Sequence, residues 1–251
     1  GCHAKQLDYK FLHGPASVRA CEVCHEYQDP AAHTFALANQ GAELCAFCHI
    51  GNTGTEGVVV HEPVAKGECL ACHNPHGGAS RQLFRAGSVS ALCASCHKDT
   101  LAGAHAHKPA GEDCTVCHQS HTARHPKLLK AEPRELCLGC HESVGLEIAA
   151  SLHPHEPVEG DCLQCHTPHA SNESKGLKAP PRELCASCHV DLVKAAATAT
   201  HPHSAVLDGR ACLNCHTAHA GERANLLPED TLGACLECHR NPGPSLRPHD
   251  Q

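Results

Sequence analysis

The sequence predicts a mostly irregular chain with short α-helices and little or no β-structure, built as an elongated tandem repeat of modules that each hold two copies of one motif. A Cys-x-x-Cys-His unit recurs ten times along the 251 residues, at steps of 21 to 27 residues. The 20 Gly and 17 Pro interrupt regular structure between the copies. A fixed period of this kind indicates stacked modules, each of which contacts mainly its neighbours.

The composition leaves the chain without enough large apolar side chains for an ordinary core. It contains no Trp, no Met, two Tyr and four Phe, and its hydrophobic fraction of 41% is inflated by Ala and Cys. Burial of such small side chains cannot offset the entropy of ordering a chain of this length. The sequence therefore predicts an interior supplied by something other than amino acids, with folding coupled to its attachment.

The repeated unit indicates what that interior is. Cys-x-x-Cys-His is the attachment motif of c-type haem: the two thiols bond to the porphyrin vinyl groups, and the imidazole that follows binds the iron. The predicted thioether cysteines are Cys21, Cys24, Cys45, Cys48, Cys69, Cys72, Cys93, Cys96, Cys114, Cys117, Cys137, Cys140, Cys162, Cys165, Cys185, Cys188, Cys212, Cys215, Cys235 and Cys238. The predicted proximal iron ligands are His25, His49, His73, His97, His118, His141, His166, His189, His216 and His239. The predicted cofactor is covalently attached haem c, in about ten copies.

Two other readings of the cysteines compete with haem attachment. Paired Cys-x-x-Cys units at similar spacing are also typical of zinc ribbons. Zinc needs four ligands per ion and gives no reason for a His after every pair. A disulfide scaffold is disfavoured because vicinal Cys-x-x-Cys thiols form redox-active rather than structural bridges.

Odd-numbered and even-numbered motifs differ, so the stronger period is a two-motif module. Odd motifs tend to follow a Gly and an upstream His, as before Cys162, whereas even motifs tend to follow Glu-Leu, as before Cys185. The modules span residues 1–52, 53–100, 101–145, 146–193 and 194–251, the last with a C-terminal tail. We expect one continuous chain of haem sites rather than independent domains.

Regular structure is expected mainly at the even motifs. Pro133-Arg134-Glu135 is typical of a helix start, and one helix is predicted from there through the Cys137 motif to Ala150. A second is predicted from Leu184 to about Ala199. Odd motifs lie among Gly, Pro and Asn, which favour short turns.

Haem iron has a second axial position, and the absence of Met excludes His/Met ligation. Two series of His recur with the modules. We call the first the upstream series, because it precedes each odd motif: His13, His61, His107, His155 and His203. We call the second the downstream series, because it follows each odd motif: His33, His76, His121, His169 and His219. Together they predict one distal ligand for every complete motif, although spacing does not say which haem each one serves.

Some His residues lie outside these series or at the ends of the sequence. His105, His153 and His201 are near-copies of the upstream series two residues earlier, and His125 is expected at the surface. Cys2-His3 resembles the end of an eleventh motif, with a lipidated or free Cys2 thiol as the alternative. Pro248-His249 resembles the upstream series, which makes His249 a candidate distal ligand of a haem elsewhere, including one in another copy of the chain.

Charge and hydropathy restrict the location and the partners. The formal net charge of −7 argues against nucleic-acid binding, which needs clustered Lys and Arg. No apolar run approaches the length of a membrane span, so no transmembrane segment is expected. No signal peptide is recognised, which is expected of a mature or trimmed chain.

The doubled motifs and the His series resemble those of multihaem c-type cytochromes with doubled CxxCH motifs. The resemblance covers nearly the whole chain and implies bis-histidine haems that pass single electrons along closely packed pairs. It also implies haem attachment outside the cytoplasmic membrane, hence an extracellular or cell-surface location, with the periplasm as the alternative. The first module departs from the pattern, since Glu26-Tyr27-Gln28 follows the motif and His33 lies further on.

Two functions are compatible with these features. The first is an electron conduit without substrate chemistry, whose partners are redox proteins, extracellular acceptors or identical subunits in a head-to-tail filament. The second is a multihaem reductase of nitrite, hydroxylamine or sulfur oxyanions. That reductase needs one open haem beside a cationic, proton-supplying pocket. The ligand count, one distal His per motif, favours the conduit.

Overall fold

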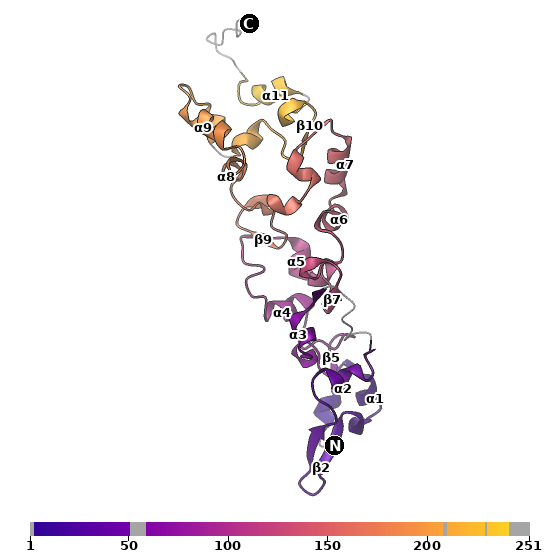
Figure 1. Ribbon diagram of the computed structural model, residues 1–251. Helices are drawn as coiled ribbons and strands as arrows, with labels where there is room; N and C mark the ends of the chain where they lie inside the picture. The colour runs from indigo at the N-terminus through magenta and orange to yellow at the C-terminus, as the bar shows by residue number, and fades with distance from the viewer. Residues whose placement is uncertain (1–2, 51–58, 208–209, 229, 241–251) are drawn as a thin grey trace. The chain divides into compact units, whose positions relative to one another are not determined.

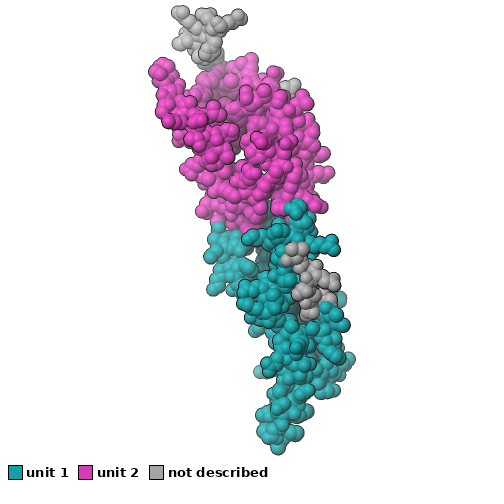
Figure 2. Space-filling model, viewed as in Figure 1, with its two compact units in different colours: residues 1–102, 106–132 teal, residues 103–105, 133–251 magenta. Residues whose placement is uncertain are grey.

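The computed structural model describes residues 3–50, 59–207, 210–228 and 230–240. The chain forms two compact units, the first made of residues 1–102 and 106–132 and the second of residues 103–105 and 133–251 (Figure 2). Both units are built from short helices, single 3-10 turns and two-stranded ladders joined by irregular chain (Figure 1). The predicted fold class, mostly irregular with short helices and minor strands, is confirmed.

The helices are too short to be stable in isolation, since isolated helices below about 12 residues are marginal in water. The α-helices are α1 (Gly14–Ser17), α2 (Ala42–Ala46), α3 (Glu62–Ala65), α4 (Val89–Ala94), α5 (Lys108–Glu112), α6 (Pro133–Leu138), α7 (Glu142–Ala150), α8 (Pro181–Ala186), α9 (Val190–Thr198), α10 (Ser204–Leu207) and α11 (Thr231–Leu236). The 3-10 turns are η1 (Ala4–Leu7), η2 (Cys21–Val23), η4 (Cys69–Ala71), η5 (Cys114–Val116), η6 (Pro126–Leu128), η7 (Glu156–Glu159), η8 (Cys162–Gln164), η9 (Ser174–Gly176), η10 (Ala211–Asn214) and η11 (Ala224–Leu226).

Even motifs begin in α-helices and odd motifs begin in 3-10 turns. The first Cys of each even motif lies in α2, α4, α6, α8 or α11, and the first Cys of each odd motif lies in η2, η4, η5, η8 or η10. Side chains cap several of these elements: the Ser88 hydroxyl accepts from the Ala91 amide, and an Asp230 carboxylate oxygen accepts from the Gly233 amide. The short turns expected at the odd motifs are confirmed.

The two long helices expected across the third–fourth and the fourth–fifth module boundaries are each split in two. The sequence predicts a single helix from Pro133 to Ala150, but α6 ends at Leu138 and α7 begins at Glu142. The helix expected from Leu184 to about Ala199 is divided in the same way between α8 and α9. The cause is the motif His, whose ψ of 48° at His141 and 47° at His189 turns the backbone off the helical path.

The strands are β1 (Phe11–Leu12), β2 (His25–Asp29), β3 (Thr34–Leu37), β4 (Val59–Val60), β5 (Gly77–Gly78), β6 (His105–Ala106), β7 (Thr122–Ala123), β8 (His153–Pro154), β9 (Ala170–Ser171) and β10 (Ala220–Gly221). β2 and β3 form a hairpin within the first module. Three antiparallel ladders, β1 with β5, β4 with β7 and β8 with β10, instead join a strand that precedes one odd motif to a strand that follows the next. We call these three the inter-module ladders.

The described polypeptide buries almost nothing large. Its buried apolar residues are Ala123, Ile148, Ala211 and Ala220, and none of the described side chains is fully buried. Large apolar side chains such as Phe47 (82% exposed) and Leu152 (85% exposed) lie open. The chain exposes 18084 Å², whereas a globular protein of its mass of 26.5 kDa would expose about 10,700 Å². The described polypeptide therefore does not supply an apolar interior of its own, as its composition predicts.

We predict that the polypeptide does not fold without its attached groups. Produced where thioether attachment does not occur, the chain should give a circular dichroism spectrum with little helix and no cooperative thermal transition, because its short helices have no core to pack on. The holoprotein measured in parallel should melt cooperatively. A sharp transition in the colourless chain would contradict this prediction.

Candidate haem sites

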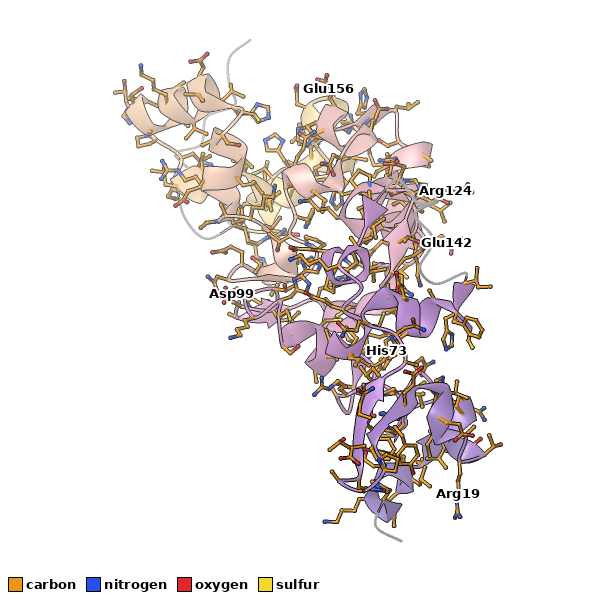
Figure 3. All side chains as sticks on the ribbon, turned by 60° about the horizontal axis from the view of Figure 1, so that its bottom comes forward. Arg19, His73, Asp99, Arg124, Glu142 and Glu156 are labelled. Carbon is orange, nitrogen blue, oxygen red and sulfur yellow. The ribbon has the colours of Figure 1, made fainter. Side chains whose placement is uncertain are left out.

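Seven motif imidazoles in the described residues each face a second imidazole from the upstream or downstream series. The facing pairs are His13 with His49, His25 with His76, His61 with His97, His73 with His121, His155 with His189, His166 with His219 and His203 with His239. Their ring centroids lie 5.8 to 6.2 Å apart. Figure 3 draws the side chains on the ribbon, with His73 labelled.

This separation fits a metal ion bound between the two rings. An imidazole–metal bond is about 2 Å long, and with about 1.1 Å from each nitrogen to its ring centre, two ligands on one ion place their centroids roughly 6 Å apart. Two imidazoles cannot satisfy zinc, which takes four protein ligands in structural sites. No group of three or more metal-ligating side chains occurs in the described residues. Two axial imidazoles are, however, all that haem iron requires of the protein.

Backbone carbonyls orient the odd-motif imidazoles for metal binding. Nδ1 of His73 donates to the carbonyl oxygen of Gln82 at 2.7 Å. The same bond joins His118 to Lys127 (2.8 Å), His166 to Lys175 (3.0 Å) and His216 to Asn225 (2.7 Å). A proton held on Nδ1 leaves the Nε2 lone pair for iron, and the hydrogen bond raises the basicity of the ligand.

A tight loop with left-handed backbone presents each of these carbonyls. Lys127, Lys175 and Asn225 have φ of 58°, 57° and 60°, and in the second module the residue after Gln82, Leu83, has φ of 57°. The loop also pairs with the motif backbone, as when the Asn74 amide donates to the Leu83 carbonyl at 2.8 Å. The loop packs directly on an inter-module ladder. A Cβ on Gly78 would lie 2.9 Å from Cα of Leu83.

Each inter-module ladder places two candidate distal ligands side by side. The His13 amide donates to the His76 carbonyl at 3.0 Å, and the equivalent bonds join His61 to His121 at 2.8 Å and His155 to His219 at 2.9 Å. The imidazole of His61 is also bonded to the opposite strand's chain, since its Nδ1 donates to the Ser120 carbonyl at 3.0 Å. The two imidazoles of one ladder then face the two motif imidazoles of one module, as His13 and His76 face His49 and His25.

Three of the downstream imidazoles, those of His76, His121 and His219, have a lowered pKa, which favours their neutral form. Burial, followed by the charge of the facing His25, lowers the pKa of His76. Burial and the facing His73 lower the pKa of His121, and burial and the facing His166 lower that of His219. A neutral imidazole keeps its nitrogen lone pair available, which is the form that binds a metal.

The facing pairs follow one rule that spacing along the sequence does not reveal. An upstream His faces the even-motif His of its own module, as His61 faces His97. A downstream His faces the odd-motif His of the preceding module, as His121 faces His73. Which imidazoles face each other is determined by the inter-module ladders. These ladders consist of two residues per strand and therefore leave almost no pattern in the sequence.

Thiols of successive motifs lie close enough to interact. Burial, followed by the neighbouring Cys69 thiol, raises the pKa of Cys45 to about 11. Burial and Cys114 do the same for Cys93, and burial and Cys212 for Cys185. In each of these cases the neighbour belongs to the next odd motif. Within a module, burial and then the Cys96 thiol raise the pKa of Cys72. The attachment points of successive motifs are therefore adjacent.

Several predicted residues are placed differently or stay predictions. His33 faces His3 instead of a complete motif. No imidazole faces His216 among the described residues, and Cys2 and His249 lie outside them. His107, His118, His141 and His169 each make interactions and keep their predicted ligand roles by position in the series. His125 donates through Nδ1 to a Glu132 carboxylate at 2.9 Å.

Comparison with known families agrees with the two-motif repeat. The family model described as "Doubled CXXCH motif" matches residues 13–53, 61–102, 107–145, 155–194 and 203–243, which together make up most of the chain. Each match contains one odd and one even motif. A search of curated proteins returns no match. In the part of the chain that the structure describes, no helix is long and apolar enough to cross a membrane.

We predict that His76→Ala opens the site of the first motif. The odd-motif iron bound by His25 would lose its sixth ligand and become high-spin, because the side chain that faces His25 comes from the next module. Electron paramagnetic resonance of the oxidised protein should show one new high-spin component. His105→Ala, which removes an imidazole outside the facing pairs, should leave the spectrum unchanged.

We also predict that Gly78→Ala raises the midpoint potential of one haem. The new Cβ would displace the Leu83 loop and weaken the His73–Gln82 hydrogen bond, which makes the imidazole a poorer donor to oxidised iron. Gly87→Ala is the matched control, because nothing lies within 4 Å of its added Cβ. A redox titration of Gly78→Ala that superimposes on that of Gly87→Ala would refute the role assigned to the loop.

Proposed function

We propose, because the chain belongs to the doubled CXXCH motif family of multihaem c-type cytochromes, that it carries single electrons along a row of about ten bis-histidine haem sites and transforms no substrate. Electron transfer is the role that its family membership supports. The number of sites, the direction of transfer and the assembly that uses it are our proposal. Each bound haem would accept and release one electron at its iron.

The observation that carries this proposal is the facing of imidazoles in pairs. Seven motif His residues have a second imidazole at the separation that two axial ligands require. A position filled by imidazole offers no place for a substrate oxygen or nitrogen. Two rings anchored to backbone carbonyls, such as His73 through Gln82 and His61 through Ser120, also keep their geometry when the charge between them changes. Small reorganisation favours transfer over catalysis.

Cysteines of neighbouring motifs lie close together along the row of sites. Cys45 and Cys69 are close enough to perturb one another's ionisation, and so are Cys93 with Cys114 and Cys185 with Cys212. Cys72 with Cys96 and Cys165 with Cys188 do the same within modules. Haems bonded to these thiols would lie with their edges close together, and electron tunnelling is fast only between haems that are near one another. The polypeptide therefore serves to hold successive attachment points close together.

We further propose that the protein works outside the cytoplasmic membrane, at the cell surface or beyond it, with the periplasm as the alternative. Attachment of haem through two thioethers supports this location. Head-to-tail assembly with identical copies is supported by three odd-motif imidazoles, those of His25, His73 and His166, each of which faces an imidazole from the next module. It is also supported by His216, which no described imidazole faces and which a His from another copy, or His249, could complete.

The second candidate function rests on the same residue. An iron bound by His216 with its sixth position open could take a small oxyanion, as a multihaem reductase requires. That function also needs proton donors and cations beside the open position. The oxidised native protein would then show a high-spin signal that shifts when nitrite or hydroxylamine is added. A wholly low-spin spectrum would eliminate the reductase.

We predict that removing one internal attachment point interrupts conduction. Cys114→Ser/Cys117→Ser should lower the current through single molecules by orders of magnitude, because tunnelling must cross a gap in the row. His125→Ala, which leaves every motif intact, should conduct as the native protein does. Equal currents in the two variants would exclude transfer along the row.

We predict that the native material forms fibres. Negative-stain electron microscopy of unfractionated protein should show filaments of uniform width. Dilution should separate the copies, and the haem iron that loses its sixth ligand from the next copy should then give a high-spin signal. Single particles with a fully low-spin spectrum would exclude head-to-tail assembly and would point to a ligand for His216 within the same chain.

A further inference from the structure

His3 and His33 form an eighth facing pair of imidazoles that no complete motif accounts for. Their Nε2 atoms lie 3.4 Å apart and their ring centroids 5.7 Å apart, with the planes tilted by 30°. The seven motif pairs have centroid separations from 5.8 to 6.2 Å. Both rings thus present to each other the nitrogen that would bind iron. The pair has the geometry of the other sites.

The sequence around His3 has the elements of a motif. Cys2 precedes it directly, as Cys140 precedes His141, although Cys2 itself lies outside the described residues. His3 also precedes His13 of the upstream series by ten residues, the spacing that separates His97 from His107. His3 therefore occupies the position of an even-motif imidazole.

An insertion in the first module carries His33 to this position. In the second module the downstream His follows its motif His by three residues, from His73 to His76, whereas His33 follows His25 by eight. The extra residues form the β2–β3 hairpin, in which the register shifts between Tyr27 and Asp29. His33 is thereby placed opposite His3.

The hairpin holds His33 in a demanding conformation. The Asp29 carboxylate accepts from the amides of Ala31 and Ala32 at 2.8 and 3.3 Å, which fixes the loop before His33. His33 has φ of 52°, a left-handed backbone that few residues other than glycine adopt. Strain of this kind persists where surrounding structure enforces it, and it is concentrated at functional sites.

Aromatic rings lie beside His33 and connect it to the first complete motif. The Phe35 ring lies 5.0 Å from the His33 ring and 6.4 Å from the His25 ring, edge-on to both. The Tyr27 ring lies 6.3 Å from His33 and 4.4 Å from Phe35. Tyr27 is 59% exposed and Phe35 is 38% exposed, in a chain with only six Tyr and Phe. A flat apolar group at His33 would cover them.

We propose that His3 and His33 are the axial ligands of an eleventh haem, next to the site of His25. The proposal rests on the proposed function, because it assigns the same cofactor and the same role to one more site. Among the described residues no third metal-ligating side chain joins the two imidazoles, an arrangement that suits iron in a porphyrin better than a bare zinc ion. The row of sites would thus extend past the first complete motif.

Intact-mass spectrometry of the mature holoprotein tests this proposal. We expect the mass of the polypeptide plus eleven haems, and the loss of one haem in Cys2→Ser. His105→Ala is the control and should keep the native haem count. A native mass that corresponds to ten haems would overturn the eleventh site and leave the proposed function intact. A native mass far below ten haems would instead refute the proposed function.

Axial ligation is tested separately from attachment. His33→Ala should keep all covalent haem but show about one high-spin ferric haem per chain in electron paramagnetic resonance. Added imidazole should refill the position and abolish that signal, which a general disruption of the hairpin would not allow. His3→Ala should also perturb a single haem. If His33→Ala stays entirely low-spin, the facing of His3 and His33 is only a hydrogen bond between two surface side chains.

Discussion

The odd-motif imidazole meets its partner only across a module boundary, and the rest of the structure depends on that constraint. His76, His121 and His219 each come from the module that follows the motif His they face. The inter-module ladder that delivers each of them consists of two residues per strand and would be negligible as a sheet. Iron bound by the facing imidazoles would stabilise the ladder, and the ladder in turn holds the two distal imidazoles in register. Much of the stability therefore comes from the interfaces between modules, here called the joints, as it does in repeat proteins generally.

The same constraint explains which residues the joints can contain. Ladder strands pack against left-handed loops at distances that leave no room for a side chain, as at Gly78 against Leu83 and Gly221 against Leu226. The few buried residues, such as Ala123 and Ala220, also lie in ladder strands. The strand that follows the odd motif is consequently made of small residues, as in β5, β7 and β10, whereas its partner strand carries larger ones, such as Phe11 in β1 and Val59 in β4.

Sequence alone predicts the fold class and the attachment chemistry because both are local. The motif places two thiols and an imidazole within five residues, and the scarcity of large apolar side chains excludes a core made of amino acids. Sequence fails where the backbone turns at the motif itself: the ψ of 48° at His141 splits the helix expected there. It also fails to pair distal with proximal ligands, since the ladders that do so involve two residues per strand. His33 shows the limit most clearly. Its place in the downstream series suggested an ordinary ligand, and the β2–β3 hairpin directs it to His3.

Odd and even sites are consequently unequal in what they need from the chain. An even site is complete within one module, since His61 and His97 flank a single pair of motifs. An odd site needs the following module to be present and docked. Adding or removing a whole two-motif unit inside such an array keeps every imidazole paired, whereas adding or removing one motif would leave an odd-motif iron with one ligand. The unit of variation is then the doubled motif, which is the unit the family model matches five times.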